Sequence, residues 1–389
     1  MISTNGFGGE PIFIIESQRG LTNIIMKGIN EYKENKFFEG YTLFCETFLG
    51  PEEDKLTKGY VNLIDMKGEI VHRWEVETSL QSYCKLLEDG NLMYPTHDRS
   101  EIARGNAGLY ELDPDSNIVW KLNCRIDHDC QMMDNGNILI HNITENFHPE
   151  ISKGMKRHPY IVEINRNKEL VWEWKGEEHY KDLKEHLSPE GWEHIVERVH
   201  GEFRFDWAHN NTTQIITENA TNEKEKAEGE NEIFKPGNII FSYRSLDVIG
   251  VIDKETDDII WAWGPGELDG QHKPHMLENG NILIFDNGTL RGYSRVIELN
   301  PLTEEIEWEY TASPKENFLS RYISGAQRLP NGNTLICEGA KAHLFEVTEN
   351  KEVVWDFTNP YRYIENEKRN IYRCLRYSPE YVEPLLERI

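Results

Sequence analysis

Three histidines, His128, His209 and His272, recur at one place in an internally repeated sequence pattern. His128 and His272 each lie eight residues before the glycine of an Asn-Gly turn. His209 lies in "DWAHNN" (206–211), the segment that enters the corresponding strand of another repeat. Imidazole titrates near neutral pH and can act as nucleophile, general base or general acid. A single histidine at a strand entry is usually a structural residue, but three that converge on one axis predict a catalytic cluster.

The repeated unit that positions these histidines is about 48 residues long: a strand, a short polar turn, and a β-branched strand carrying a ring. The aligned ring positions are His72, Trp120, Trp172, Trp261, Trp308 and Trp355. The first five are followed by a hairpin pattern such as "LLEDGNLMY" or "MLENGNILI", in which Asp-Gly or Asn-Gly tolerates positive φ. Four short strands per unit and six units predict an all-β fold, a six-bladed β-propeller of four-stranded blades.

The ends of the chain are expected to close this ring. The sixth copy lacks its own hairpin, and an unmatched strand, "GYTLFCE" (40–46), precedes the first copy. We therefore expect residues 40–46 to complete the last blade, which would leave no open edge. Residues 39–389 would form one propeller domain after an N-terminal arm (1–38). The segment "NIYRCLRYSPEY" near the C-terminus would pack on the closing blade.

Two insertions interrupt the third blade. Residues 176–205 have a helical composition with a helix start at Ser188-Pro189-Glu190, and residues 217–232 are highly charged and predict a mobile surface loop. The first insertion contains four histidines whose spacing does not place them on one helical face, so no metal site is expected there. These histidines are His179, His186, His194 and His200.

Three arginines follow the candidate histidines along the chain. Arg244 lies downstream of His209, and Arg291 and Arg295 lie downstream of His272. Each alone is more often a surface or inter-blade arginine. One of them near the axis would hold an anionic group.

Other polar and aromatic residues near these motifs are expected to support the site. Asp206 or Asn211 would fix the tautomer of His209, and the Asn287 amide would reach the channel. His275 is a weaker candidate, because strand alternation places it opposite His272 unless Pro274 breaks the alternation. The aromatic residues Trp207, Phe205 and Tyr243 would line the mouth, although such residues more often pack between blades.

Several motifs together resemble the arylsulfate sulfotransferase family: "DWAHNN", "GQHKPHMLENGNILIFDNG", "YSRVIELNP" and "SGAQRLPNGNTLICEG". The resemblance extends from residue 40 to residue 381 and implies a six-bladed propeller. It also implies that a sulfuryl group moves from an aryl sulfate ester to a phenol through a transiently sulfated histidine, without cofactor or metal. By position, His209 and His272 match two family histidines, and Arg291 or Arg295 matches the channel arginine.

The sequence departs from the family at one important position. The family's sulfated histidine comes from the blade that here contains "SGAQRLPNG", where Ser324 and Gln327 stand instead of a histidine. Ser324 is therefore expected to contact substrate only. Either His128, His209 or His272 is the nucleophile, or transfer is direct, or the activity has been lost.

The formal net charge of −26 excludes nucleic acid and an anionic membrane surface as partners. A span of roughly 20 apolar residues and a secretory signal are both missing, so a cytoplasmic protein is expected. The expected partners are a small aryl sulfate and a phenol. The main alternative is a catalytically inactive propeller that binds a small anion or a protein. A quinone-dependent dehydrogenase is disfavoured, because it usually has eight blades and a calcium site.

Overall fold

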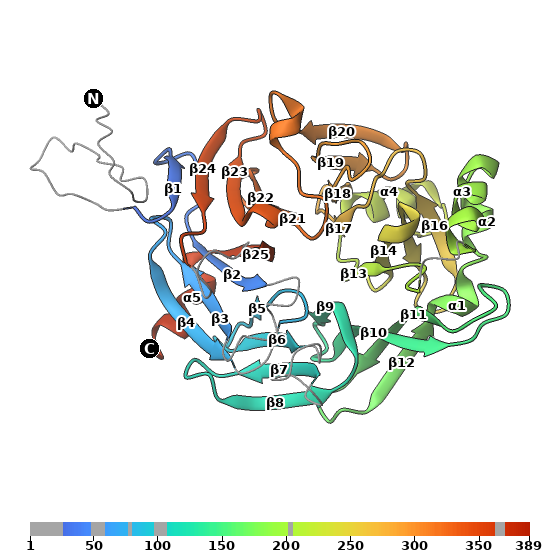
Figure 1. The fold of residues 1–389 in the computed structure, drawn as a ribbon, viewed down its shortest axis with the longest axis horizontal. Helices are drawn as coiled ribbons and strands as arrows, with labels where there is room; N and C mark the ends of the chain where they lie inside the picture. The colour runs from blue at the N-terminus through green and yellow to red at the C-terminus, as the bar shows by residue number, and fades with distance from the viewer. Residues whose placement is uncertain (1–25, 48–58, 77–79, 97–106, 201–204, 362–369) are drawn as a thin grey trace, which may run out of the picture.

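The computed structural model describes residues 26–47, 59–76, 80–96, 107–200, 205–361 and 370–389. Six antiparallel sheets stand around a central axis, which confirms the predicted six-bladed β-propeller (Figure 1). Five sheets have four strands and one has five. Within the described residues, no helix is both long enough and apolar enough to cross a bilayer.

The strands of each blade run from the hub outward, and we number the blades from the first in the chain. Blade 1 contains β25 (Asn370–Tyr377), β2 (Tyr41–Thr47), β3 (Gly59–Ile64) and β4 (Ile70–Val76). Blade 2 contains β5 (Lys85–Leu86), β6 (Leu92–Thr96), β7 (Gly108–Leu112) and β8 (Ile118–Asn123). Blade 3 contains β9 (Ile126–Met132), β10 (Ile138–Asn146), β11 (Lys156–Ile164) and β12 (Leu170–Lys175).

The remaining blades follow the same order. Blade 4 contains β13 (Asn210–Ile215), β14 (Ile239–Tyr243), β15 (Val248–Ile252) and β16 (Ile259–Trp263). Blade 5 contains β17 (His272–Met276), β18 (Ile282–Asp286), β19 (Arg295–Asn300) and β20 (Glu305–Tyr310). Blade 6 contains β21 (Gly325–Arg328), β22 (Thr334–Glu338), β23 (His343–Val347), β24 (Val353–Thr358) and β1 (Ile29–Tyr32). Short 3₁₀ turns lie at Arg244–Leu246, Lys315–Asn317 and Gly339–Lys341.

Ring closure differs from the sequence expectation. The strand at residues 41–47, β2, belongs to the first blade and not to the last, and β25 supplies the innermost strand of that blade. The last blade is complete without β2 and gains β1 from the predicted N-terminal arm on its outer edge. The prediction was wrong because the closing strand comes from the C-terminus, whose sequence has no Asn-Gly turn to reveal it. Residues 1–25 of the arm lie outside the described part.

The two insertions also form ordered helices. The connection from β12 to β13 contains α1 (Gly176–His179), α2 (Leu183–His186) and α3 (Pro189–Val199), so it lies between blades 3 and 4 and not inside one blade. The helix start at Ser188 is confirmed, since its hydroxyl accepts a hydrogen bond from the Gly191 amide. Residues 201–204 lie outside the described part.

The charged segment 217–232 is not a loop throughout, because it contains the helix α4 (Ala220–Glu228). Asn219 caps the start of this helix, and the buried carboxylate of Glu225 accepts the backbone amides of Ile233 and Phe234. These bonds hold the segment against the propeller despite its charge. A last helix, α5 (Pro379–Leu386), buries Val382 and Leu385 against blades 1 and 2.

The repeated ring position joins neighbouring blades. In five of its six members a ring nitrogen contacts the outer polar turn of the next blade: His72 to the Pro114 carbonyl, Trp120 to Arg166, Trp172 to Asp257, Trp308 to Glu349, and Trp355 to Met66. The Trp355 bond connects blade 6 to blade 1 and is buried, with nitrogen and oxygen 2.9 Å apart. The repeat is therefore a set of inter-blade hydrogen bonds as well as a packing pattern.

Replacing Trp355 by Phe should destabilise the protein by about 1–3 kcal/mol, because a buried carbonyl loses its donor and the core loses volume. Trp261→Phe is the matched control, since the Trp261 indole is buried but makes no such bond among the described residues. Chemical denaturation should show the larger loss for Trp355→Phe. Equal losses would mean that the inter-blade hydrogen bond contributes nothing.

His343 on β23 makes stability depend on pH. Its Nδ1 lies 2.9 Å from Glu338 and its Nε2 lies 2.9 Å from Asp356. Burial lowers the pKa of His343, but the hydrogen bonds to Asp356 and Glu338 outweigh it and raise the pKa to about 9. The unfolded chain has a histidine pKa near 6.5, so this interaction stabilises the fold fully below about pH 6.5 and is lost as pH rises through 9.

The free energy of unfolding should therefore fall between pH 6.5 and 9 by on the order of 3 kcal/mol from this group. His343→Gln should remove that part of the pH dependence in urea denaturation series. An unchanged slope in the variant would contradict the assignment.

Candidate active site

The innermost strands enter the hub through irregular backbone. Residues at these entries have left-handed backbone, with φ of 60° at His128, 50° at His209, 56° at Lys273 and 88° at Ser324. Register shifts, as in β-bulges, occur in β9, β13 and β17, which contain or directly follow the first three of these residues, and also in the pairing of β25. A bulge leaves extra residues unpaired and re-aims their side chains. The hub therefore gathers side chains that a regular strand would direct alternately into the blade interfaces.

His209 is oriented by Asp206, as the sequence predicted. One carboxylate oxygen of Asp206 accepts a hydrogen bond from the backbone amide of His209, and the other oxygen lies 2.9 Å from His209 Nδ1. A carboxylate only accepts hydrogen bonds, so this contact places the proton on Nδ1 and leaves Nε2 with a lone pair. The His209 side chain is 32% exposed, so it is accessible from solvent.

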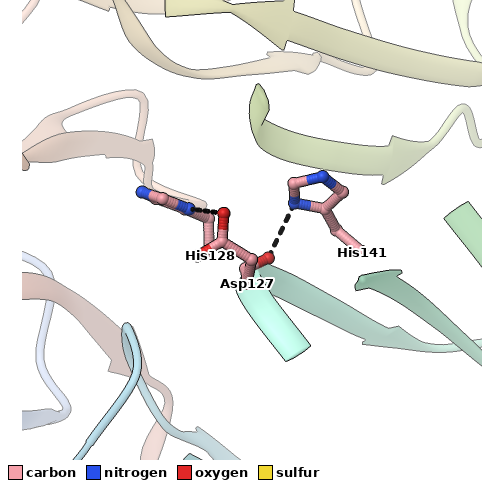
Figure 2. A group of neighbouring side chains, drawn as sticks. All are labelled: Asp127, His128 and His141. Carbon is pink, nitrogen blue, oxygen red and sulfur yellow. Dashed lines mark hydrogen bonds and ion pairs between the residues drawn. The ribbon is translucent and has the colours of Figure 1, made fainter. Parts of the chain in front are cut away.

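His128 lies beside His209, with ring centroids 4.7 Å apart. Its Nδ1 is 2.7 Å from the carboxylate of Asp127, and the backbone carbonyl of Asp127 lies 2.7 Å from Nδ1 of His141. Figure 2 shows Asp127 between the two imidazoles. Burial lowers the pKa of His128 and lowers that of His141 to about 4, although Asp127 acts in the opposite direction on both. Both rings are therefore neutral at pH 7.

His272 at the start of β17 is almost fully buried and has a fixed orientation. Its Nδ1 is 2.7 Å from Asn287 Oδ1 and 3.2 Å from the Gly270 carbonyl. The Asn287 amide nitrogen donates to the Ser320 and Ile323 carbonyls, so the Asn287 oxygen must face the ring. Both neighbours of Nδ1 are therefore acceptors. We infer that Nδ1 carries the proton and that Nε2 has a free lone pair.

Positive charges surround His272. Burial, followed by the charges of Arg244 and Arg373, lowers its pKa well below 6.5, and His128 adds to this effect. The imidazole is therefore neutral at physiological pH and nucleophilic at Nε2. His128 is in ring contact with His209, and its charge lowers the pKa of His272; we call these three residues the histidine cluster.

The three predicted arginines lie in two different environments. Arg291 and Arg295 do not face the histidines, because both are bound to the buried carboxylate of Asp286, at 2.9 and 2.8 Å. Arg295 also pairs with Glu267 and Glu309. Their positive charges are thus already compensated. Arg244, also predicted, influences His272, and one of its guanidinium nitrogens donates to the Arg321 carbonyl.

Three predicted substrate contacts are used inside the protein. The Ser324 hydroxyl donates to Ser320 and accepts the Gly339 amide, so it faces blade 6 and not the channel. The Asn211 amide donates to the Gln271 carbonyl beside His272. Trp207 does not line the mouth, since it is fully buried with its indole bonded to His158.

Tyr243, Phe205 and His275, which were also predicted near the site, differ in burial. Tyr243 is fully buried in the same core as Trp207, whereas Phe205 is 46% exposed. His275 lies on the same face of the sheet as His272. In the bulged strand His272 is opposite Phe285 and His275 is opposite Leu283, and these two partners are two residues apart on β18. His275 Nδ1 contacts the Lys273 carbonyl, and burial lowers the pKa of His275 to about 4.

Several hub residues escaped the sequence reasoning. Asp127 and Asp129 flank His128 in "IDHDCQM", where two carboxylates in an inner strand are themselves unusual. Lys273 directly follows His272 and could have been noticed for the same reason. Arg373 could not be found by counting from a turn, because its strand is the closing strand β25.

Two groups of described residues could hold a metal ion. Asp127, His128 and His141 are buried and offer ligand atoms within 4.8 Å of one another, and His179, Asp182 and Asp258 form the second group. In the first group, His141 Nδ1 already donates to the Asp127 carbonyl. That hydrogen bond turns the protonated nitrogen of His141 toward Asp127, so we interpret this group as a hydrogen-bond network that positions His128.

Comparisons with known proteins identify the family of the chain and support its fold. The sequence profile of a family described as Arylsulfotransferase (ASST) matches residues 84–360. No curated protein sequence matches the chain. A solved protein of unknown function from Bacteroides caccae is 15% identical over 87% of this chain and 98% of its own, with a TM-score of 0.51. This likeness shows the fold alone.

The chain has lower similarity to two other solved structures. A streptogramin B lyase is 10% identical over 86% of this chain and 88% of its own, with a TM-score of 0.44. A virginiamycin B lyase from Staphylococcus aureus is 11% identical over 85% of this chain and 89% of its own, with a TM-score of 0.43.

The tautomer of His272 can be tested by nitrogen-15 NMR. We expect its ring to stay neutral with the proton on Nδ1 from pH 8 to pH 6.5, because its pKa lies well below 6.5. Asn287→Ala should shift the population toward the Nε2-protonated form, since one of two acceptors is removed. The spectrum of His272→Gln assigns the signal. A His272 resonance that titrates in this range, or a dominant Nε2–H form in the unaltered protein, would refute the assignment.

Proposed function

The chain belongs to the arylsulfotransferase family, and we propose that it moves a sulfuryl group from an aryl sulfate ester to a phenolic acceptor at the hub histidines. Family membership supports sulfotransferase activity in general and small-molecule substrates. The specific donor, acceptor and residue roles are our proposal. The observation that carries it is the pair of oriented imidazoles at His209 and His272, with the charges of Arg244 and Arg373 acting on His272.

In the first half-reaction, Nε2 of His272 attacks the sulfur of the donor. The N–S bond forms while the S–O(aryl) bond breaks, and the electron pair of that bond leaves with the phenolate oxygen. Sulfuryl transfer resembles phosphoryl transfer, with a loose in-line transition state and charge on the equatorial oxygens. In this proposal Arg244 and Arg373 stabilise that charge, and their lowering of the His272 pKa supports this role.

His209 handles the proton in both half-reactions. In its protonated form it donates a proton to the leaving phenolate, and in its neutral form it accepts the proton of the incoming phenol through Nε2. The acceptor oxygen then attacks sulfur, the N–S bond breaks, and His272 returns to its neutral state. Asp206 stabilises the imidazolium and keeps Nδ1 protonated, as a carboxylate does in a catalytic triad.

His128 and Asn287 act as positioning residues in this proposal. His128 packs against the His209 ring, and Asn287 holds His272. The alternative function is a binding module for a small anion. The positive charges of Arg244 and Arg373 at the hub favour it as the second candidate.

The test is a transfer assay with chromogenic aryl sulfates and phenol acceptors. His272→Ala should reduce kcat/KM by at least about 1,000-fold, since nucleophilic catalysis is lost. His209→Ala and Asp206→Asn should reduce it by about 100-fold or more, and less with donors whose phenolate is a good leaving group. His186→Gln is the control, because His186 lies on α2 in the helical connection and its Nε2 bonds the Ile259 carbonyl of β16.

Full turnover in His272→Ala would exclude His272 as the nucleophile. Equal losses for good and poor leaving groups in His209→Ala would exclude His209 as the general acid. A wild-type protein that is inactive over a broad donor panel would favour the binding module.

A further inference from the structure

Below the histidine cluster, two hydrogen bonds cross the hub between opposite blades. Lys273 of blade 5 donates to the Tyr83 hydroxyl, which precedes β5 of blade 2, at 3.1 Å. Arg373 of blade 1 donates to the Asn211 carbonyl of blade 4 at 2.7 Å. The aliphatic parts of Lys273 and Arg373 both pass close to Gly325. A Cβ added to Gly325 would lie 3.3 Å from Lys273 Cβ and 3.6 Å from Arg373 Cδ. The hub is therefore occupied at this level by two buried cationic side chains.

Among the described residues, a single carboxylate, that of Asp129, forms ion pairs with Lys85 and Arg373. Arg373 Nη1 lies 3.9 Å from the Asp129 carboxylate, and the ammonium of Lys85 lies 3.7 Å from it. The charges of Lys273, Lys85 and Arg373 all lower the pKa of Asp129. Its oxygens accept hydrogen bonds from Tyr83, the Thr213 amide and Gln214. Burial raises the pKa of Asp129, but the three cations outweigh it and lower the pKa to about 2. When Lys273 is protonated, three formal positive charges thus share one negative charge.

The other partners of these cations are neutral. Arg373 donates to the Ser324 and Asn211 carbonyls and lies against the rings of Tyr83 and Tyr372, at 4.9 and 5.3 Å. Its Nη1 is buried without a hydrogen-bond partner among the described residues. Lys273 and Lys85 both lie 5.3 Å from the Tyr83 ring, and Lys85 also donates to the Cys130 carbonyl. Carbonyls and rings do not neutralise two surplus charges in a buried site.

We propose that Lys85, Lys273 and Arg373 form a binding site for a small divalent oxyanion beside the histidine cluster, with Arg373 common to both. Two surplus positive charges match a dianion, and the three side chains approach from β5, β17 and β25, so their donors can reach several oxygens of one tetrahedral ion. The chain carries a net charge of −26, which makes this concentration of cations a local feature and not a property of the whole surface. The site does not require that the protein transfers sulfuryl groups.

Calorimetric titration with inorganic sulfate, and separately with inorganic phosphate, tests this site at constant ionic strength. Sulfate should bind with one-to-one stoichiometry, and chloride should not compete at equal ionic strength. Lys273→Met and Lys85→Met should each weaken sulfate binding at least tenfold. Lys121→Met is the matched control, since Lys121 lies over the Tyr110 ring at 5.6 Å on the outer strand β8, and it should leave binding unchanged.

A readout on the unaltered protein remains informative if a variant fails to fold. Burial, followed by the charges of Lys85 and Arg373, lowers the pKa of Lys273 to about 7 although Asp129 and Cys130 oppose this, and its ammonium also faces Tyr83. A dianion favours the charged form, so at pH 8 sulfate binding should take up protons. Binding heats measured in two buffers of different ionisation enthalpy report this uptake.

Sulfate binding that survives in His209→Ala and is lost in Lys273→Met would place the anion at this site, whether or not the protein transfers sulfuryl groups. Absence of saturable binding in the wild type, or full binding in Lys273→Met, would overturn the proposal. Stronger binding of phosphate than of sulfate would identify phosphate as the preferred ion of the same site. Neither result depends on the transfer assay, so the two proposals can fail separately.

Discussion

The pairing of β25 with β2 is the constraint on which the hub depends. It joins the C-terminal strand to the first blade, with Leu375 opposite Leu43 and Cys374 opposite Phe44. Without it the first blade would lack its innermost strand, and Arg373 would not enter the hub. A closed ring also leaves each inner strand facing an opposite one, which is why Lys273 can reach Tyr83 and Arg373 can reach Asn211. Closure therefore creates the site as well as protecting the sheet edges.

Within the closed ring, local hydrogen bonds determine the chemistry of each imidazole. Asp206 holds His209 through a charged acceptor, whereas Asn287 holds His272 through a neutral amide. The two rings therefore differ in character: a carboxylate stabilises the imidazolium at His209, and burial with nearby cations opposes it at His272. One ring suits proton transfer and the other suits nucleophilic attack. This division needs no difference in residue type, only in the partner of Nδ1.

The sequence predicted the architecture well because the propeller is encoded by a short-range repeat. The Asn-Gly turns and the ring positions recur at fixed spacing, and the spacing alone aligned His128 with His272. The orientation of His209 by Asp206 was also foreseeable, since the two residues lie in one short segment. The assignment of Arg291 and Arg295 failed because their partner, the buried carboxylate of Asp286, became visible only when β18 and β19 were paired.

Long-range contacts were beyond the reach of the repeat. Arg373 comes from a strand without a turn motif, and Trp207 is drawn into the core by the helices that follow β12. The charge of α4 suggested solvent exposure, yet Glu225 is buried because backbone amides satisfy it. In each case a residue's partner lies far away in the sequence or in an irregular connection, where periodicity carries no information.

The most direct measurement is to look for a covalent sulfuryl group on the protein. The wild type is mixed with an aryl sulfate in the absence of acceptor, quenched in alkali, digested and mapped by mass spectrometry. The account predicts a sulfuryl adduct on His272, which disappears when a phenol is added before the quench. An adduct on another residue, or sustained transfer with no adduct at any time point, would contradict it.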